Sequence, residues 1–304
     1  MIGVDTARKW YKYIGITLLC GVLCLGACGN QGAPAGAARG EGAEKEKVLS
    51  RTEEAQARAA RIRMPEASGV VVTEKGGITV DASNTAHGYI MVKSGDSGAR
   101  RKVILKNGAA TSTYDLPTSN EYTIYPLQHG DGKYALTVYQ NVESNLYTPI
   151  LTTSVAVTLD NELEPYLYPN QYVSYGPDDA SVLESFLLVP GDTDAESAVD
   201  KLYRYVARNI AYDYDKAASV GTGYLPVPDD TLESGMGICF DYSALLATML
   251  RVQEVPTQLV IGYVAPDNLY HAWNKAYVNG EWVWMDATFS GERKESAYTD
   301  ERWY

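Results

Sequence analysis

The stretch GMGICFDYSALL, residues 235–246, decides the fold expected for this chain. A glycine-rich turn there gives way to a run of helix formers, and Cys239 stands at the junction. The first N–H groups of a helix have no internal partner and carry partial positive charge, which favours a thiolate over a thiol. The alternative is that this cysteine is a small buried hydrophobe, as most lone cysteines are. Its place at a helix start makes Cys239 the candidate nucleophile.

Residues 270–288 are expected to form a β-hairpin that places two further polar side chains. Alternating aromatic and β-branched residues flank Asn279 and Gly280, the pair favoured in a two-residue type I′ turn. In that register His271 lies one step diagonally from Asp286 on the same face, with roughly 7–8 Å between the backbones. Asp286 can then accept a hydrogen bond from the imidazole. A three-residue loop would reverse the parity, so this prediction depends on the turn.

Cys239, His271 and Asp286 can therefore serve as nucleophile, general base and orienting carboxylate, the combination that thiol acyl transfer requires. The residues around them resemble the transglutaminase-like superfamily. The similarity extends over about residues 178–290, and its motifs are specific in combination although each is weak alone. The matching stretches are VARNIAYD (206–213), TLESGMGICFDYSA (231–244), VPTQLVIGY (255–263), HAW (271–273) and WMDAT (284–288).

The resemblance implies an α+β, papain-like core in which a helix carrying Cys239 packs against an antiparallel sheet carrying His271 and Asp286. It also implies a mechanism. The Cys239 thiolate attacks a carboxamide or peptide carbonyl, and the resulting thioester is resolved by an amine, which gives a crosslink, or by water, which gives deamidation or peptide hydrolysis. The motif residues do not choose between these acceptors. No cofactor and no metal ion are expected.

The oxyanion that develops in such a reaction needs hydrogen-bond donors. The backbone N–H of Cys239 is the first candidate, because it lies at a helix start. A side chain upstream of the nucleophile is the second, and Tyr212 is the position expected to supply it. The competing interpretation for this residue is a strand tyrosine that packs beside the helix.

The N-terminal residues 1–28 have the pattern of a lipoprotein signal peptide. Three basic residues precede an apolar run from 14 to 27, which is short for a membrane-spanning helix. The run ends in LGAC (25–28), which resembles the lipobox of bacterial lipoproteins. Cleavage would leave Cys28 as a lipid-carrying N-terminus, anchored on the extracytoplasmic face of a bacterial membrane. An ordinary signal peptide or an uncleaved anchor are the alternatives.

The rest of the chain divides into three predicted regions. Residues 29–66 lack aromatic residues and nearly all aliphatic bulk, which predicts a flexible tether. Residues 67–160 contain about seven short strands separated by turn residues, which predicts an immunoglobulin-like β-sandwich. The segment LQHGDGKY (127–134) in it resembles a tyrosine corner. Residues 161–304 then form the transglutaminase-like domain.

Charge and cysteine content restrict the function further. The net charge is −12, and removing residues 1–28 (three basic, one acidic) changes it to −14, which argues against nucleic acid and against electrostatic binding to anionic lipid. In the mature chain Cys28 and Cys239 leave no pair for an internal disulfide. Three acidic clusters are interpreted as helix caps or solvated faces, with calcium binding as the minor alternative: Asp178–Asp179, Asp192–Asp194 and Asp229–Asp230.

The chain is therefore expected to be a monomeric, exported thiol enzyme of the cell envelope. Its substrates would be proteins, peptides or cell-wall peptides. The alternative is a catalytically silent lipoprotein that binds a partner or has a structural role at the cell surface. The presence of all three residues of the predicted triad favours the enzyme.

Overall fold

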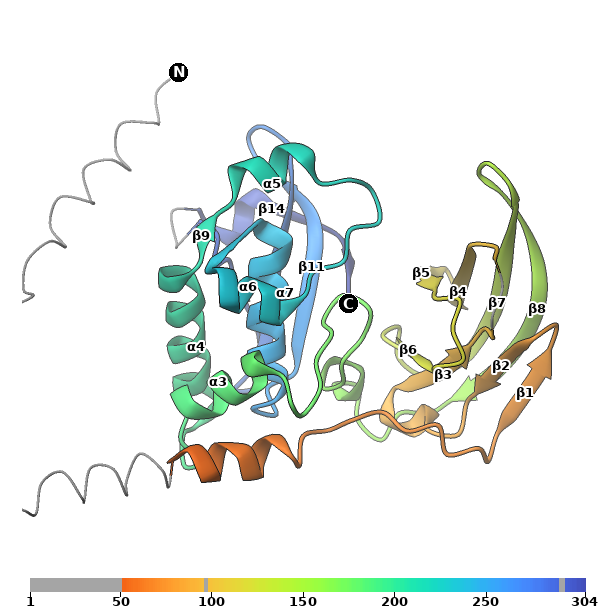
Figure 1. Cartoon of the computed structure of the whole chain (residues 1–304), viewed down its shortest axis with the longest axis horizontal. Helices are drawn as coiled ribbons and strands as arrows, with labels where there is room; N and C mark the ends of the chain where they lie inside the picture. Colours follow the sequence, from red (N-terminus) through yellow and green to blue (C-terminus); the bar gives the residue numbers. More distant parts are fainter. Residues whose placement is uncertain (1–50, 96–97, 290–292) are drawn as a thin grey trace, which may run out of the picture. The chain divides into compact units, whose positions relative to one another are not determined.

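The computed structural model describes residues 51–95, 98–289 and 293–304 (Figure 1). The predicted signal peptide and its Cys28 lie outside these residues. The described residues belong to one compact unit. Among them, no helix is both long enough and apolar enough to span a bilayer.

Residues 72–157 form two four-stranded antiparallel sheets. Their inner residues belong to one apolar cluster, so the two sheets pack face to face as a β-sandwich. The first sheet has the order β1 (Val72–Lys75), β2 (Ile78–Asp81), β3 (Tyr89–Lys93), β6 (Thr123–Pro126). The second has the order β5 (Ala110–Leu116), β4 (Arg101–Asn107), β7 (Gly132–Glu143), β8 (Leu146–Val157).

The tyrosine-corner segment has the hydrogen bonds expected of it. The hydroxyl of Tyr134 is buried, donates to the carbonyl of Leu127 at 2.9 Å and accepts from the N–H of His129 at 2.9 Å. This side chain therefore fixes the loop that leads into β7. The all-β character of the region is confirmed, whereas its assignment to the immunoglobulin-like class stays a prediction.

Residues 180–303 contain several α-helices and a third four-stranded sheet, which confirms the α+β class. The sheet is antiparallel, and its order is β13 (Glu281–Met285), β12 (Leu269–Val278), β11 (Thr257–Val264), β14 (Tyr298–Trp303). A short parallel pair, β9 (Ala211–Tyr212) and β10 (Met236–Gly237), lies apart from it. The helices are α3 (Ala180–Leu188), α4 (Ala195–Asn209), α5 (Tyr214–Ser219), α6 (Pro228–Ser234) and α7 (Cys239–Arg251).

Helix α7 lies at the centre of this half, against the ribbon of β11 (Figure 1). All its residues from Asp241 to Arg251 are buried, as expected of a helix that is covered on every side. One face, with Ala244 and Ala247, packs on the sheet through Leu259, Ile261 and Ala272. The opposite face packs on α4. The sheet and α4 together therefore fix the position of the helix start.

The predicted tether needs correction over its described part. Residues 51–59 are helical, and Ala55 and Ala59 are buried in the core cluster. Arg58 donates to the carbonyl of Val189 at 2.6 Å, and its guanidinium lies 4.3 Å from the ring centre of Phe186. The composition correctly indicated that this segment has no core of its own. It is ordered nevertheless, because small alanines and long arginine side chains dock on a surface made by other elements.

The β-sandwich and the α+β half share one apolar core. A single cluster contains Val103 and Tyr114 from the sandwich together with Leu259 from β11. Arg251, at the end of α7, is fully buried and donates only to backbone carbonyls. These are the carbonyls of Thr257 (3.0 and 2.7 Å), Tyr168 (2.6 Å) and Tyr304 (2.9 Å).

Candidate active site

The thiol of Cys239 is placed by local backbone geometry. Gly235 has φ of 63°, which ends α6, and the chain then forms β10. Ile238 is the extended N-cap of α7, so Cys239 is the first helical residue. Its side chain is half-buried and its thiol is free. The predicted helix start is therefore confirmed, with the thiol at the positive end of a helix whose remaining turns are buried.

Gly237 is required at this helix start by close packing. A Cβ at this position would lie 2.7 Å from the Cβ of Asp241, which real structures do not tolerate. The carboxylate of Asp241 bends back to accept the N–H of Ile238 at 2.8 Å. This bond satisfies one donor just before Cys239. The glycine-rich turn therefore admits an acidic cap directly beside Cys239.

The hairpin has the register expected from the sequence. Asn279 and Gly280 both have positive φ, and the β12–β13 ladder extends from Val278 opposite Glu281 to Asn274 opposite Met285. The imidazole Nε2 of His271 lies 2.8 Å from Oδ2 of Asp286. Both side chains are buried, at 3% and 1% exposure. The hydrogen bond that the hairpin argument required is present.

Asp286 is held as a carboxylate by several donors. Its Oδ2 also accepts the hydroxyl of Tyr298 at 2.7 Å, and its Oδ1 accepts the N–H of Thr288 at 2.8 Å. Burial favours the neutral acid, but the hydrogen bond and charge of His271, with those two donors, outweigh it and lower the pKa of Asp286. Asp286 is therefore an anion at neutral pH, which an orienting carboxylate must be.

His271 is held as a cation by the same cluster. Burial lowers its pKa, but hydrogen bonds and charges from Asp286 and from the side chain of Cys239 outweigh burial and raise it to about 9. Because Nε2 is engaged with Asp286, Nδ1 is the nitrogen left for the thiol. The ring of Phe289 stacks on the imidazole at 4.7 Å and limits its rotation. The geometry therefore brings the three predicted residues together as thiol, imidazolium and carboxylate.

Tyr212 lies beside the thiol. In the parallel pair β9–β10 it is opposite Gly237, two residues before Cys239. Its pKa is raised, first by burial and then by the charge of Cys239, so the two groups are close enough to interact electrostatically. Its ring also packs against Tyr214 at 4.9 Å. The structure is thus compatible with both interpretations of Tyr212, and its oxyanion role stays a prediction.

A second buried polar cluster at the same helix start was not expected from the sequence. Asp241 has no exposed surface, and its carboxylate accepts the Lys216 ammonium at 2.7 Å and the Tyr224 hydroxyl at 2.5 Å. The Lys216 ammonium also lies 4.5 Å from the centre of the Tyr224 ring. The cluster ties α5 and the segment after it to the residues beside Cys239. The sequence indicated this cluster only through the acidic Asp241 at the third position of the helix. Nothing near Asp241 in the sequence identifies its partners.

The acidic clusters include two helix caps, as interpreted. Asp194 accepts the N–H of Ser197 at the start of α4 at 2.9 Å. Asp229, which belongs to α6, accepts the N–H groups of Ala180 (2.9 Å) and Ser181 (2.8 Å) at the start of α3. These bonds satisfy helix donors that would otherwise have no partner.

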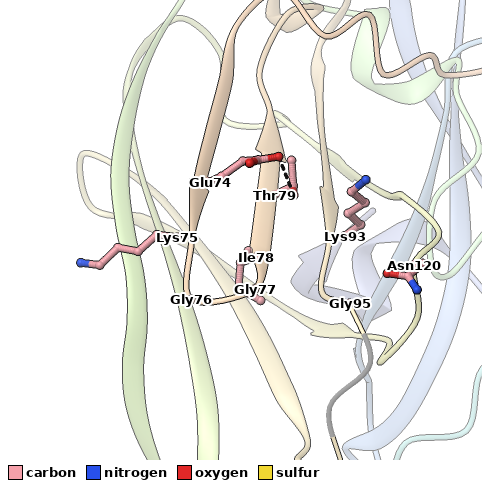
Figure 2. Close-up of a pocket in the computed structure, with 9 residues that line it drawn as sticks. All are labelled: Glu74, Lys75, Gly76, Gly77, Ile78, Thr79, Lys93, Gly95 and Asn120. Atoms are coloured by element: carbon pink, nitrogen blue, oxygen red, sulfur yellow. Dashed lines mark hydrogen bonds between the residues drawn. The ribbon is translucent and has the colours of Figure 1, made fainter.

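A surface hollow of about 320 Å³ lies on the β-sandwich, where the β1–β2 turn meets the end of β3 (Figure 2). In Figure 2 the side chain of Lys75 extends away from the others, and Glu74 accepts the hydroxyl of Thr79 at 3.3 Å. None of the predicted site residues lines it. It is lined by Glu74, Lys75, Gly76, Gly77, Ile78, Thr79, Lys93, Gly95 and Asn120.

Comparison with known proteins gives a family match within the α+β half. Residues 187–287 match the family model described as the transglutaminase-like superfamily. A stretch of 89 residues is 31% identical to the UPF0252 protein MJ1282 of Methanocaldococcus jannaschii, over 26% of this chain and 25% of that protein. A stretch of 119 residues is 24% identical to cytokinesis protein 3 of Schizosaccharomyces pombe, over 36% of this chain and 13% of that protein. The chain thus spans a quarter or less of these curated relatives.

Among solved structures, a candidate cysteine protease from Cytophaga hutchinsonii is similar, with a TM-score of 0.40 and 17% identity. The superposition covers 71% of this chain and 83% of that one.

Proposed function

A domain of the transglutaminase-like superfamily spans residues 187–287, and we propose that it is an active thiol acyltransfer enzyme. Cys239 is the nucleophile, His271 the acid and base, and Asp286 the orienting carboxylate. The observation that carries the proposal is the buried His271, bonded to Asp286 at 2.8 Å and raised in pKa by both Asp286 and Cys239. An imidazolium between a thiol and a carboxylate is the arrangement that stabilises a thiolate.

The reaction begins with attack of the Cys239 thiolate on a carboxamide or peptide carbonyl. The oxyanion that forms is stabilised by the backbone N–H of Cys239, with the hydroxyl of Tyr212 as second donor. His271 then gives its proton to the leaving ammonia or amine as the tetrahedral intermediate collapses to a thioester. The neutral imidazole next takes a proton from the acceptor, an amine or water, as the acceptor attacks the thioester. Departure of the thiolate then regenerates the thiolate–imidazolium pair.

The compartment and the substrates are part of the same proposal. Residues 1–28 act as a lipoprotein signal, and Cys28 carries the lipid that anchors the enzyme on the outer face of a bacterial membrane. Proteins, peptides or cell-wall peptides supply the acyl group. A reduced thiol retained in an exported protein supports a chemical use for Cys239, because an unused thiol would only be exposed to oxidation.

The experiment that tests the activated thiol is alkylation by iodoacetamide from pH 4 to pH 10 on the full-length chain. Labelling of Cys239 is followed by mass spectrometry of its peptide, with the His271→Ala variant as control. Fast labelling that persists below about pH 6 and disappears in the control supports the proposal, because an ordinary thiol ionises near pH 8.5. Labelling that follows one ionisation near pH 8.5 in both proteins would instead favour a catalytically silent surface protein.

Substrate turnover tests the second half of the reaction. Incorporation of a fluorescent primary amine into a glutamine-containing peptide reports crosslinking, and release of ammonia without incorporation reports hydrolysis. The Cys239→Ala variant should keep the fold and lose both activities. Acyl transfer retained in that variant would refute the mechanism.

A further inference from the structure

The sheet face that α7 covers continues beyond the start of the helix. Arg251, at the end of α7, bonds to the carbonyl of Thr257, whereas Ser243, near its start, accepts from Asn274, which pairs with Leu259. Moving along β11 from residue 257 toward 263 therefore leads toward the start of α7 and Cys239. On this face Leu259 and Ile261 are covered by α7.

Tyr263 is the next residue of β11 on the covered face, and it is 36% exposed. Its partner on β12 is Tyr270, which is 50% exposed. Arg302 on β14 pairs with Ile261, so its side chain leaves the sheet on the same face. The ladder shifts between Ile261 and Gly262, and such a bulge redirects neighbouring side chains. An open surface of two tyrosines and a guanidinium thus continues the covered sheet face beyond the start of α7.

Arg302 is linked to both reacting residues through their chain neighbours. Its guanidinium donates to the hydroxyl of Tyr270, the residue before His271, and lies 5.9 Å from the centre of that ring. Tyr172 is close enough to Arg302 for an electrostatic interaction, and its ring lies 6.1 Å from the ring of Phe240, the residue after Cys239. Burial lowers the pKa of Arg302, but nearby Tyr304, Tyr270, Glu301 and Tyr172 outweigh burial and raise it.

The charge of Arg302 is available to a ligand. Among the described residues, Arg302 pairs with Glu301 at 3.9 Å, and both side chains are nearly half exposed, a geometry that contributes little energy. Arg251 provides the contrast, since its guanidinium is fully buried and bonded to three backbone carbonyls. A guanidinium presents a planar fork of donors that matches a carboxylate.

We propose that Arg302, with Tyr270 and Tyr172, forms a subsite for a carboxylate of the acyl-donor peptide. The fork of Arg302 binds the carboxylate, the hydroxyl of Tyr270 adds a second donor, and the tyrosine rings cover the adjoining aliphatic part. The enzyme then selects donors in which a carboxylate lies at a fixed spacing from the reacting carbonyl. This inference rests on the proposed nucleophile and names what that nucleophile acts on.

The test uses affinity reagents of graded length on the full-length chain: bromoacetyl-Gly, bromoacetyl-Gly-Gly and bromoacetyl-Gly-Gly-Gly, each as free acid and as amide. Cys239 displaces bromide from each of them. At one length the acid should label faster than the amide, and Arg302→Gln should reduce that acid-to-amide ratio about tenfold. Arg302→Lys should give an intermediate ratio. Arg204→Gln, an exposed arginine on α4, should leave the ratio unchanged.

The amide reagents separate the possible failures. If they label Cys239 no faster than in His271→Ala, the proposed function fails. If the amides label Cys239 equally fast in the native chain and in Arg302→Gln, the variant is folded. If the acid-to-amide ratio of that folded variant also equals the native ratio at every length, the subsite is overturned. A matched pair of reagents, bromoacetyl-Asp-amide and bromoacetyl-Asn-amide, distinguishes a side-chain carboxylate from a terminal one. Faster labelling by the Asp reagent that is lost in Arg302→Gln supports the subsite with a side-chain carboxylate.

Discussion

The β-sandwich and the α+β half differ in what their buried carboxylates bond to. In the sandwich, the buried carboxylate of Asp81 accepts the backbone N–H groups of Gly69 and Ser83. In the α+β half, the buried carboxylates of Asp286 and Asp241 also bond to side chains that can carry a positive charge, those of His271 and Lys216. Side chains that bond to backbone hold the chain in place, whereas side chains that bond to each other also set their protonation states. The difference locates the chemistry in the second half.

Breaking the His271–Asp286 pair should have the largest effect. In Asp286→Asn the amide cannot stabilise the imidazolium, so acyl transfer should fall by about 10³- to 10⁴-fold, and the pKa of His271 should drop from about 9. The rate is measured by amine incorporation and the pKa by NMR of the labelled imidazole. Asp300→Asn, which removes an exposed carboxylate on β14, is the matched control. A normal rate in Asp286→Asn would remove Asp286 from the mechanism.

The same pair predicts a pH dependence of stability. The folded pKa of His271 lies above its usual value of 6.5, so its contribution to folding is complete below about pH 6.5 and is lost as pH rises through about 9. Asp286 adds no pH dependence of stability between pH 6.5 and 9, because its pKa is lowered and it stays ionised throughout. Urea unfolding at pH 6 and pH 9.5 should show the decrease in the native chain and a smaller one in Asp286→Asn. Equal decreases in both would contradict the assignment.

Breaking the cluster around Asp241 should have an intermediate effect. Asp241→Asn leaves the Lys216 ammonium facing a neutral amide, and the free energy of unfolding should fall by on the order of 2–3 kcal/mol. Labelling of Cys239 should slow as well, because the same carboxylate caps the helix start. Asp200→Asn, which opens an exposed ion pair with Arg204, should change stability by less than about 0.5 kcal/mol. Equal losses of unfolding free energy in Asp241→Asn and Asp200→Asn would contradict this prediction.

The smallest effect is expected in the sandwich. Tyr134→Phe leaves a buried carbonyl and N–H without their partner, and the free energy of unfolding should fall by about 1–2 kcal/mol. Iodoacetamide should label Cys239 at the native rate, because no titratable group of the site touches Tyr134. Slower labelling at unchanged stability would show that the two halves are coupled more closely than their hydrogen bonds indicate.

The sequence predicted the parts of the site that depend on neighbouring residues. The Asn279–Gly280 turn determined the hairpin register, and the register brought His271 to Asp286. The docking of residues 51–59 escaped prediction, because alanines and arginines show no apolar pattern until another element offers them a surface. The partners of Asp241 escaped for a similar reason, since Lys216 lies 25 positions earlier on a different helix.

The sequence alone indicated a candidate nucleophile at a helix start, a hairpin whose turn fixes which residues share a face, and two halves of different fold class. These properties follow from backbone preferences of a few adjacent residues and from the two-residue period of a strand. Only the tertiary structure decided which side chains lie near the start of α7: Asp241 with Lys216, and Arg302 with Tyr270 and Tyr172. Such contacts join residues distant in sequence, and they exist only because the packing of α7, β11 and β14 brings their ends together.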